Sequence, residues 1–316
     1  MFEGFANVWT PVGDARSLGS RPLGVSVAGE KLALFRDGRG GVGAVVDRCP
    51  HRGVALSLGR VTPEGCLACP FHGWEFDAAG RCAHVPLSPD AKREALGVVA
   101  VPARELGGLL WVYTAPGATA PCEPSPPESL TRTDLARGYT DEVWRVHWTR
   151  AMENMLDSPH VPFVHRASIG RDQARRMTRG SRMVMRWTAT DFGGCIGMTL
   201  DDQPELGLLE FHKPNIMVLK IPIPGRLFHM HSICVPLSQR ETLMIVVGTR
   251  DFATSSLLTP FFNRSNKKVL GEDRAVLESS DPPEVPPAGE ERSVANDRPT
   301  LQFRKYYFDT LKPSAA

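Results

Sequence analysis

The stretch CPHRGVALSLGRVTPEGCLACPFHGW, from Cys49 to Trp74, contains two short motifs that each offer one thiolate and one imidazole. The motifs are Cys49-x-His51 and Cys69-x-x-His72. Tetrahedral zinc also accepts two Cys and two His, so the ligand types alone leave zinc open. Zinc fingers usually pair Cys with Cys and His with His, whereas each arm here holds one of each. A binuclear iron–sulfur cluster needs this arrangement if Cys49 and Cys69 bind one iron and His51 and His72 bind the other.

The cysteine count, the net charge and the N-terminal stretch argue against a disulfide-rich, nucleic-acid-binding or membrane protein. Seven cysteines, an odd number, are scattered along 316 residues, and a chain of this length does not need disulfides. Thirty-seven Lys plus Arg against 35 Asp plus Glu leave a net charge of +2, too weak to indicate nucleic acid or an anionic membrane as partner. The N-terminal stretch lacks a signal-peptide pattern, and no apolar run reaches the roughly 18 residues of a membrane span. We therefore expect a cytoplasmic protein that acts on a small molecule or a protein.

The pattern of short elements predicts two domains of an α+β protein. β-Rich runs between Gly and Pro at 22–29, 31–37, 41–47 and 109–116 predict an all-β domain over residues 1–115. Five prolines between positions 116 and 127 predict a linker over residues 116–140. The remainder, 141–316, mixes helical patterns at 145–157, 266–279 and 302–312 with strand patterns at 215–223, 230–237 and 241–252. We expect these residues to fold as a second domain with both helices and strands.

A second cluster of metal-ligand residues lies in ENMLDSPHVPFVH, residues 153–165. Steps of three place Asn154, Asp157 and His160 on a slanted stripe along one side of a helix. Two prolines in the same stretch predict a bend that could bring His165 round to the same metal. Two histidines and one carboxylate with open positions bind ferrous iron for oxygen activation. Taken alone, the histidine pair is a weak signal, because unrelated surface or core histidines also explain it.

The third ligand is predicted in the helical pattern KKVLGEDRAVLES, residues 267–279. Asp273 has apolar residues three and four positions away on both sides, so it lies on the apolar stripe, where an acid needs a partner. Glu272 and Arg274 fall on the polar side, which a solvated helix face explains. We predict Asp273 as the carboxylate ligand, with Asp281 and Glu278 as the alternatives.

The order of these motifs resembles a known family. The stretches CPHRG and CPFHGWEFDAAGRCAHVP resemble the cluster-binding loops of Rieske proteins. The Asn-x-x-Asp-x-x-His-x4-His motif and the late Asp-bearing helix resemble the Rieske non-heme iron oxygenases, the aromatic-ring-hydroxylating oxygenase alpha subunits. Within that family the chain is similar to the group of vanillate and dicamba O-demethylases and, more distantly, to chlorophyllide a oxygenase. The chain is short for this group, so loops over the substrate pocket are expected to be trimmed.

The resemblance implies a role for each predicted residue. A Rieske [2Fe–2S] cluster is then held by Cys49, His51, Cys69 and His72, and a mononuclear Fe(II) by His160, His165 and Asp273. Asp157 and Asn154 are then catalytic, and Asp157 also meets a cluster-bound histidine of a neighbouring subunit in a homotrimer. The catalytic domain is expected to have a helix-grip (START-like) fold with an antiparallel sheet.

The resemblance also implies the reaction and its partners. Electrons from a separate NAD(P)H reductase, possibly through a ferredoxin, and O2 serve to hydroxylate or to O- or N-demethylate a ring-containing small molecule. No Gly-rich dinucleotide fingerprint is seen in the chain itself. The main rival is a Rieske electron-transfer protein fused to a ligand-binding helix-grip domain without oxygenase activity. A further rival is a helix-grip binder with degenerate metal sites.

Overall fold

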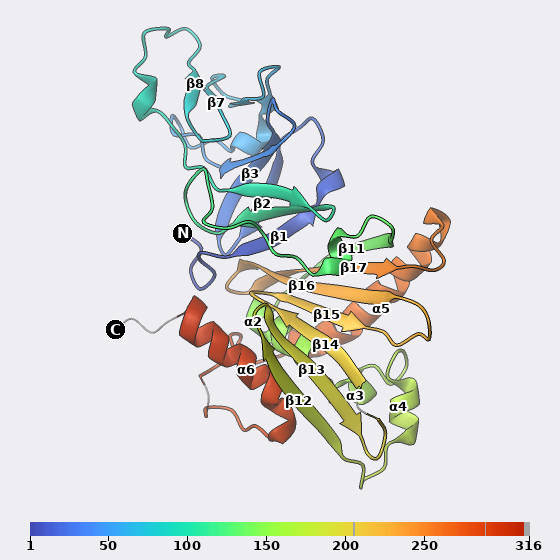
Figure 1. Cartoon of the computed structure of the whole chain (residues 1–316). Coiled ribbons are helices and arrows are strands. Elements are labelled where there is room, and N and C mark those ends of the chain that lie inside the picture. The colour runs from blue at the N-terminus through green and yellow to red at the C-terminus, as the bar shows by residue number, and fades with distance from the viewer. Residues whose placement is uncertain (205, 288, 313–316) are drawn as a thin grey trace. The chain divides into compact units, whose positions relative to one another are not determined.

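The computed structural model describes residues 1–204, 206–287 and 289–312. The chain divides into two compact units, Met1–Pro126 and Pro127–Ala316 (Figure 1). None of the helices among the described residues is long and apolar enough to cross a membrane.

The first unit is built from three small antiparallel sheets with the strand orders β1-β10-β9, β2-β3-β4 and β5-β6-β7-β8. Its strands are β1 (Trp9–Asp14), β2 (Leu23–Val27), β3 (Glu30–Arg36), β4 (Val42–Val46), β5 (Arg60–Val61), β6 (Leu67–Ala68), β7 (Glu75–Phe76), β8 (Cys82–His84), β9 (Ala103–Leu106) and β10 (Leu109–Tyr113). Short 3₁₀ turns lie at Ala15–Ser17, Leu56–Leu58 and Arg93–Ala95. The four β-rich runs of the sequence correspond to β2, β3, β4 and β10, which confirms the all-β prediction.

The core of the first unit includes the two cysteines of the opening motif. Cys49 and Cys69 belong to the same buried cluster as Phe35, Leu67 and Phe76. β3 is buried on both faces, since consecutive residues along it have no exposed surface. The loops that carry the two motifs are therefore fixed to a packed core.

The second unit contains one seven-stranded antiparallel sheet with the order β11-β17-β16-β15-β14-β13-β12 (Figure 1). Its strands are β11 (Ala136–Trp144), β12 (Met183–Thr190), β13 (Gly193–Leu200), β14 (Leu206–His212), β15 (Ile216–Lys220), β16 (Phe228–Ser238) and β17 (Glu241–Arg250). Its helices are α1 (Glu128–Thr131), α2 (Trp148–Leu156), α3 (Val161–Val164), α4 (Arg171–Arg176), α5 (Thr259–Leu277) and α6 (Arg298–Tyr306), with shorter turns at Ser256–Leu258, Ala295–Asp297 and Tyr307–Leu311. An antiparallel sheet with helices confirms the predicted α+β class.

Helices α5 and α6 cover one face of this sheet through aromatic side chains. Phe228 and Arg250 are register partners and so point to the same face. Phe262 of α5 packs on both, with its ring 5.8 Å from Phe228 and the Arg250 guanidinium 4.2 Å above it. Phe303 of α6 packs edge-on against Phe211 of β14 at 5.7 Å. Helix α5, which carries Asp273, is thus held against the sheet.

Two element boundaries differ from the sequence prediction. β11 begins at Ala136 and pairs with β17, so the sheet starts inside the stretch predicted as linker. The run of prolines ends at Pro127, and the following residues have no feature that prevents a strand. Helix α5 begins at Thr259, seven residues before the predicted start at residue 266, because Pro260 occupies its first turn, where a missing N–H costs nothing.

Candidate metal centres

The two motif loops of the first unit share one backbone design. Each loop closes with the same pair of backbone hydrogen bonds. In the first loop, Cys49 N–H donates to Val54 O (2.8 Å) and Gly53 N–H donates to Cys49 O (2.8 Å). In the second loop, Cys69 N–H donates to Trp74 O (2.8 Å) and Gly73 N–H donates to Cys69 O (3.0 Å). Gly53 and Gly73 occupy equivalent positions with φ of +73° and +70°, which a residue with a side chain adopts at a cost. The Cys-Pro-x-x-Gly spacing common to both loops therefore presents two cysteines in the same way.

The two cysteine thiols lie beside each other in an apolar setting. Both residues are only 2% exposed. Burial raises the pKa of the Cys49 thiol, the backbone N–H of His51 lowers it, and the adjacent Cys69 thiol raises it again. Two adjacent thiolates in an apolar setting need a cation to balance their charge. This donor pair fits a ferric ion.

The two histidines of the loops also lie together. The rings of His51 and His72 are 4.6 Å apart, and His51 stacks on Trp74 with 4° between the ring planes. Nδ1 of His51 is buried and has no hydrogen-bond partner among the described residues. Burial, followed by His72 and Arg52, lowers the pKa of His51, so its ring is held in the neutral form that binds metal. An orphaned ring nitrogen next to a second imidazole fits the histidine side of a binuclear cluster.

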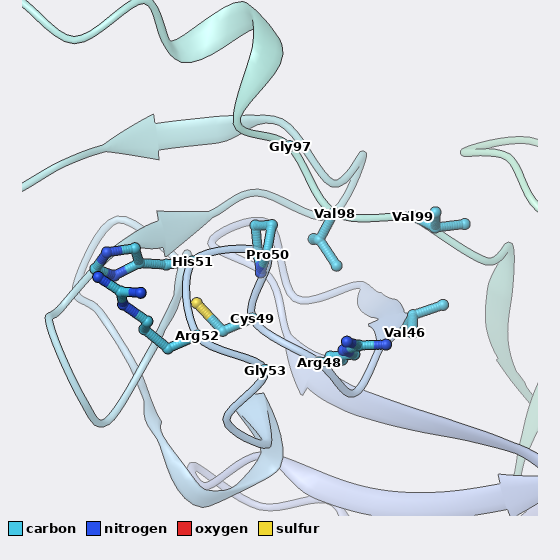
Figure 2. Close-up of a pocket in the computed structure, with 10 residues that line it drawn as sticks. All are labelled: Val46, Arg48, Cys49, Pro50, His51, Arg52, Gly53, Gly97, Val98 and Val99. Atoms are coloured by element: carbon cyan, nitrogen blue, oxygen red, sulfur yellow. The ribbon is translucent and has the colours of Figure 1, made fainter.

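A hollow of about 400 Å³ opens beside the first loop. It is lined by Val46, Arg48, Cys49, Pro50, His51, Arg52, Gly53, Gly97, Val98 and Val99. Figure 2 shows His51 and Arg52 at one end of the hollow and Arg48 at the other, with the segment Gly97–Val99 running beside them. Both arginines are exposed, so this surface next to the cysteine–histidine loop is positively charged.

The second group of ligand residues is carried by a broken helix. α2 ends at Leu156, Asp157 is extended (φ −101°, ψ 106°), and His160 precedes the four-residue helix α3. The prediction of one helical stripe through Asp157 and His160 is therefore wrong, since only Asn154 lies within α2. Ser158 precedes Pro159, and a residue before proline is disfavoured in the α conformation. The predicted bend at the prolines is confirmed, and His165 caps the end of α3.

The bend brings His160 and His165 to Asp273 of α5. One ligand atom from each of these three residues lies within 4.8 Å of the others, so the group could hold a metal ion. Asp273 Oδ1 is 3.5 Å from Nε2 of His160 and 3.0 Å from Nε2 of His165. This oxygen is buried and accepts no well-oriented hydrogen bond from the described residues. Three donor atoms that face one another in a buried place, one of them an unsatisfied carboxylate oxygen, fit a divalent cation.

The alternatives for the third ligand occupy other surroundings. Glu278 follows the last residue of α5 and accepts a hydrogen bond from the backbone N–H of Arg145 at 2.9 Å. Asp281 is exposed. Among the described residues, neither belongs to the group around His160 and His165.

Nε2 of each histidine faces Asp273, and Nδ1, the outer ring nitrogen, lies near a second carboxylate. Nδ1 of His160 is 3.4 Å from Asp157 Oδ2, and Nδ1 of His165 is 2.8 Å from Glu272 Oε2. The helical period predicts a solvated position for Glu272, and the structure corrects this prediction, since its carboxylate bonds a nearly inaccessible histidine. Burial lowers the pKa of His165, but the carboxylates of Asp273 and Glu272 outweigh it and the net pKa is raised. Burial raises the pKa of Glu272, but hydrogen bonds from Ser168 and His165 outweigh it and the net pKa is lowered.

Asn154, predicted as a catalytic residue, lies on α2 near its end. Its side-chain Nδ2 is buried and has no hydrogen-bond partner among the described residues. A buried amide N–H without a partner is costly, so it is available to a ligand or a water.

The chain is similar to known proteins over its first unit and over most of its length. Residues 8–101 match the Rieske [2Fe-2S] domain. Chlorophyllide a oxygenase of Chlamydomonas reinhardtii is 29% identical over 302 residues, which cover 87% of this chain and 43% of that protein. The oxygenase component of dicamba O-demethylase from Stenotrophomonas maltophilia is 34% identical over 176 residues, covering 55% of this chain and 51% of that protein. The chain thus spans about half or less of these relatives' length.

The fold has counterparts among solved structures. Pseudomonas putida CBB5 NdmA superposes with a TM-score of 0.80 at 23% identity, covering 95% of this chain and 89% of that one. The chain thus contains a Rieske [2Fe-2S] domain, and it is similar in sequence to named oxygenases and in fold to NdmA. The Rieske domain implies the [2Fe–2S] cluster, and the His160, His165 and Asp273 group fits a mononuclear non-heme iron.

Proposed function

We propose that this chain is the oxygenase component of a multi-component system that uses O2 and NAD(P)H-derived electrons to modify a ring-containing small molecule. One observation carries the proposal: the same chain holds paired Cys/His loops in its first unit and a buried His/His/Asp group in its second. An electron carrier would need only the first. The second unit is then the catalytic one.

In the first unit, Cys49 and Cys69 would hold one iron of the cluster and His51 and His72 the other. The core fixes the two cysteines, and Trp74 orients the His51 ring by stacking on it. Because two neutral imidazoles replace two thiolates, the cluster carries less negative charge than an all-cysteine one and accepts an electron more readily.

In the second unit, His160, His165 and Asp273 would bind ferrous iron from one side and leave its other positions open. When bound, the cluster supplies one-electron transfer and the ferrous ion supplies O2 activation, for insertion of one oxygen atom into a C–H bond. Asp273 offsets part of the charge of the cation, Glu272 accepts a hydrogen bond from Nδ1 of His165, and Asp157 lies 3.4 Å from Nδ1 of His160. The Asn154 amide would donate a hydrogen bond to substrate or water near the metal.

The substrate class follows from the relatives. One relative is named as a dicamba O-demethylase and another as a chlorophyllide a oxygenase. Dicamba and chlorophyllide a are both ring-containing compounds. If the attacked carbon is a methyl group on oxygen or nitrogen, the hydroxymethyl product collapses and releases formaldehyde. Attack on a ring or alkyl carbon leaves a hydroxylated product instead.

Electrons would enter from a separate reductase, directly or through a ferredoxin. The exposed Arg48 and Arg52 beside the cluster loop favour an acidic electron donor at the hollow of Figure 2. We also propose a homotrimer in which Asp157 meets a cluster-bound histidine of the neighbouring subunit.

The activity test uses reduced protein with three sets of compounds: aromatic methyl ethers, N-methyl ring compounds and unmethylated ring compounds. The proposal predicts formaldehyde from the methylated compounds, or a hydroxylated product that carries one ¹⁸O atom when ¹⁸O2 is supplied. His160→Ala should form neither product. An iron-loaded, reducible protein that consumes no O2 with any set would favour the electron-transfer alternative.

A further inference from the structure

We infer that Glu272 is a positioning residue, which fixes the tautomer and orientation of His165 so that this histidine can hold the metal. The inference rests on the proposed iron site. It says that the affinity of this site for metal also depends on a residue that is not one of the three predicted ligands. It makes the two outer carboxylates, Glu272 and Asp157, unequal.

The hydrogen bond of His165 determines which nitrogen is free. Glu272 Oε2 lies 2.8 Å from Nδ1, so a neutral His165 donates its single N–H there. Its lone pair is then on Nε2, which faces Asp273 Oδ1 at 3.0 Å. The metal-binding tautomer is thereby set before any metal arrives.

Neighbouring residues hold Glu272 in turn. The hydroxyl of Ser168 donates to the same oxygen, Oε2, that accepts from His165. The side chain of Glu272 is 20% exposed, whereas that of His165 is 2% exposed. A charge-assisted hydrogen bond that is this protected is stronger than a surface ion pair. Glu272 and Asp273 are consecutive on α5, so one helix carries both the carboxylate that fixes Nδ1 of His165 and the carboxylate that faces its free Nε2.

The partner of the other histidine is held less tightly. Asp157 Oδ2 is 3.4 Å from Nδ1 of His160, and that nitrogen makes no hydrogen bond among the described residues. The Asp157 side chain is 32% exposed and follows the end of α2 in extended backbone. Of these two carboxylates, Glu272 is therefore the one that mainly supports metal retention by the ligands, which leaves Asp157 available for a contact outside this site.

The test measures metal binding rather than turnover, with Co(II) as the probe because elemental analysis separates it from cluster iron. Protein with an intact cluster and an empty mononuclear site is dialysed against graded Co(II). Glu272→Ala should weaken Co(II) binding about 10- to 100-fold, since outer-shell partners of ligating histidines have effects of this size. Glu272→Gln keeps an acceptor for the His165 N–H without the charge and should recover part of the loss.

Two further variants make the result specific. Asp172→Ala removes an exposed carboxylate of α4 and should bind Co(II) as the wild type does. Asp157→Asn should weaken binding less than Glu272→Ala. If Glu272→Ala does not fold, Glu272→Gln alone decides, with several-fold weakening expected.

Each contrary outcome has one meaning. Wild-type affinity in Glu272→Ala, or in Glu272→Gln when only that variant folds, would overturn the positioning role while leaving the proposed function intact. Equal loss in Asp157→Asn and Glu272→Ala would overturn the inequality of the two carboxylates. If the wild type binds no Co(II), or His165→Ala binds it equally well, the proposed function fails and the inference fails with it.

Discussion

Nε2 of His165, at the end of α3, lies 3.0 Å from Oδ1 of Asp273, which is near the C-terminal end of α5. Six strands of the sheet, β12 to β17, and helix α4 separate the two residues along the chain. The contact therefore forms only when the sheet has folded and α5 has packed across it. The metal group is a product of tertiary structure, and the predictions below test what positions it and what it does.

Gly170 controls the turn that follows His165. Its N–H donates to the His165 carbonyl at 3.0 Å, and a Cβ at this position would lie 2.1 Å from the carbonyl oxygen of Val161. Gly170→Ala must displace α3 and should lower the free energy of unfolding by about 1–3 kcal/mol, the usual cost of overpacking. It should also reduce the mononuclear metal content.

The matched control is Gly180→Ala, where the nearest atom to a new Cβ is Thr178 Oγ1 at 3.8 Å. Denaturant unfolding and elemental analysis of both variants provide the comparison. If the two variants match in stability and metal content, the tight turn does not position His165.

Glu291 links stability to pH. Hydrogen bonds from Arg150 lower its pKa to about 2, against the effect of burial and with help from Arg304. Its unfolded pKa is about 4.3, so its contribution is present above that pH and is lost as the pH falls from about 5 towards 2. Glu291→Gln should lower the free energy of unfolding at neutral pH by about 1–2 kcal/mol, less than a buried pair, because the side chain is 33% exposed.

Chemical denaturation at a series of pH values measures this effect. The acid limb of the stability curve should be shallower in Glu291→Gln than in the wild type, while Asp172→Asn on the surface should leave the slope unchanged. Identical slopes in all three proteins would show that Glu291 is not the linked group.

The sequence predicted the local features of both centres. The Cys-Pro-x-x-Gly loops are readable because spacing and glycine positions fix their backbone within six residues. Asp273 was found because helical period alone places it on an apolar stripe, where an unpaired acid is costly, and the structure buries it at 3% exposure. Each of these signals can be read from its own short segment of sequence.

What the sequence did not reveal depends on contacts between segments. Glu272 looked solvated by helical period, but α3 packs beside α5 and supplies His165 and, shortly after it, Ser168 as partners. A carboxylate next to a predicted ligand was the only local hint. The step-of-three pattern also predicts a helical Asp157, but Pro159 disfavours the α conformation at Ser158, and the backbone of Asp157 is extended.

The cluster ligands are tested by spectroscopy. Cys69→Ser should lose the [2Fe–2S] absorption, because a hydroxyl replaces the buried thiolate that would hold ferric iron. Cys66→Ser, three residues earlier and only partly buried, is the matched control and should keep the spectrum. A visible and EPR spectrum unchanged in Cys69→Ser would remove this residue from the ligand set.

Asp157 is expected to serve electron transfer more than metal binding. Asp157→Asn should keep the cluster and most of the mononuclear metal, yet lose most turnover with reductase and NAD(P)H. Rapid mixing should show the prereduced cluster failing to reoxidise when O2 and substrate arrive. A cluster that reoxidises at the wild-type rate would limit Asp157 to supporting His160.

Iron and acid-labile sulfide analysis of the wild type beside Asp273→Ala tests the central claim most directly, that one chain holds a Rieske cluster and a separate mononuclear iron. The account predicts about three irons and two sulfides per wild-type chain, and about two irons with two sulfides in Asp273→Ala. Two irons per chain in both proteins, or zinc in place of iron with no sulfide, would contradict it.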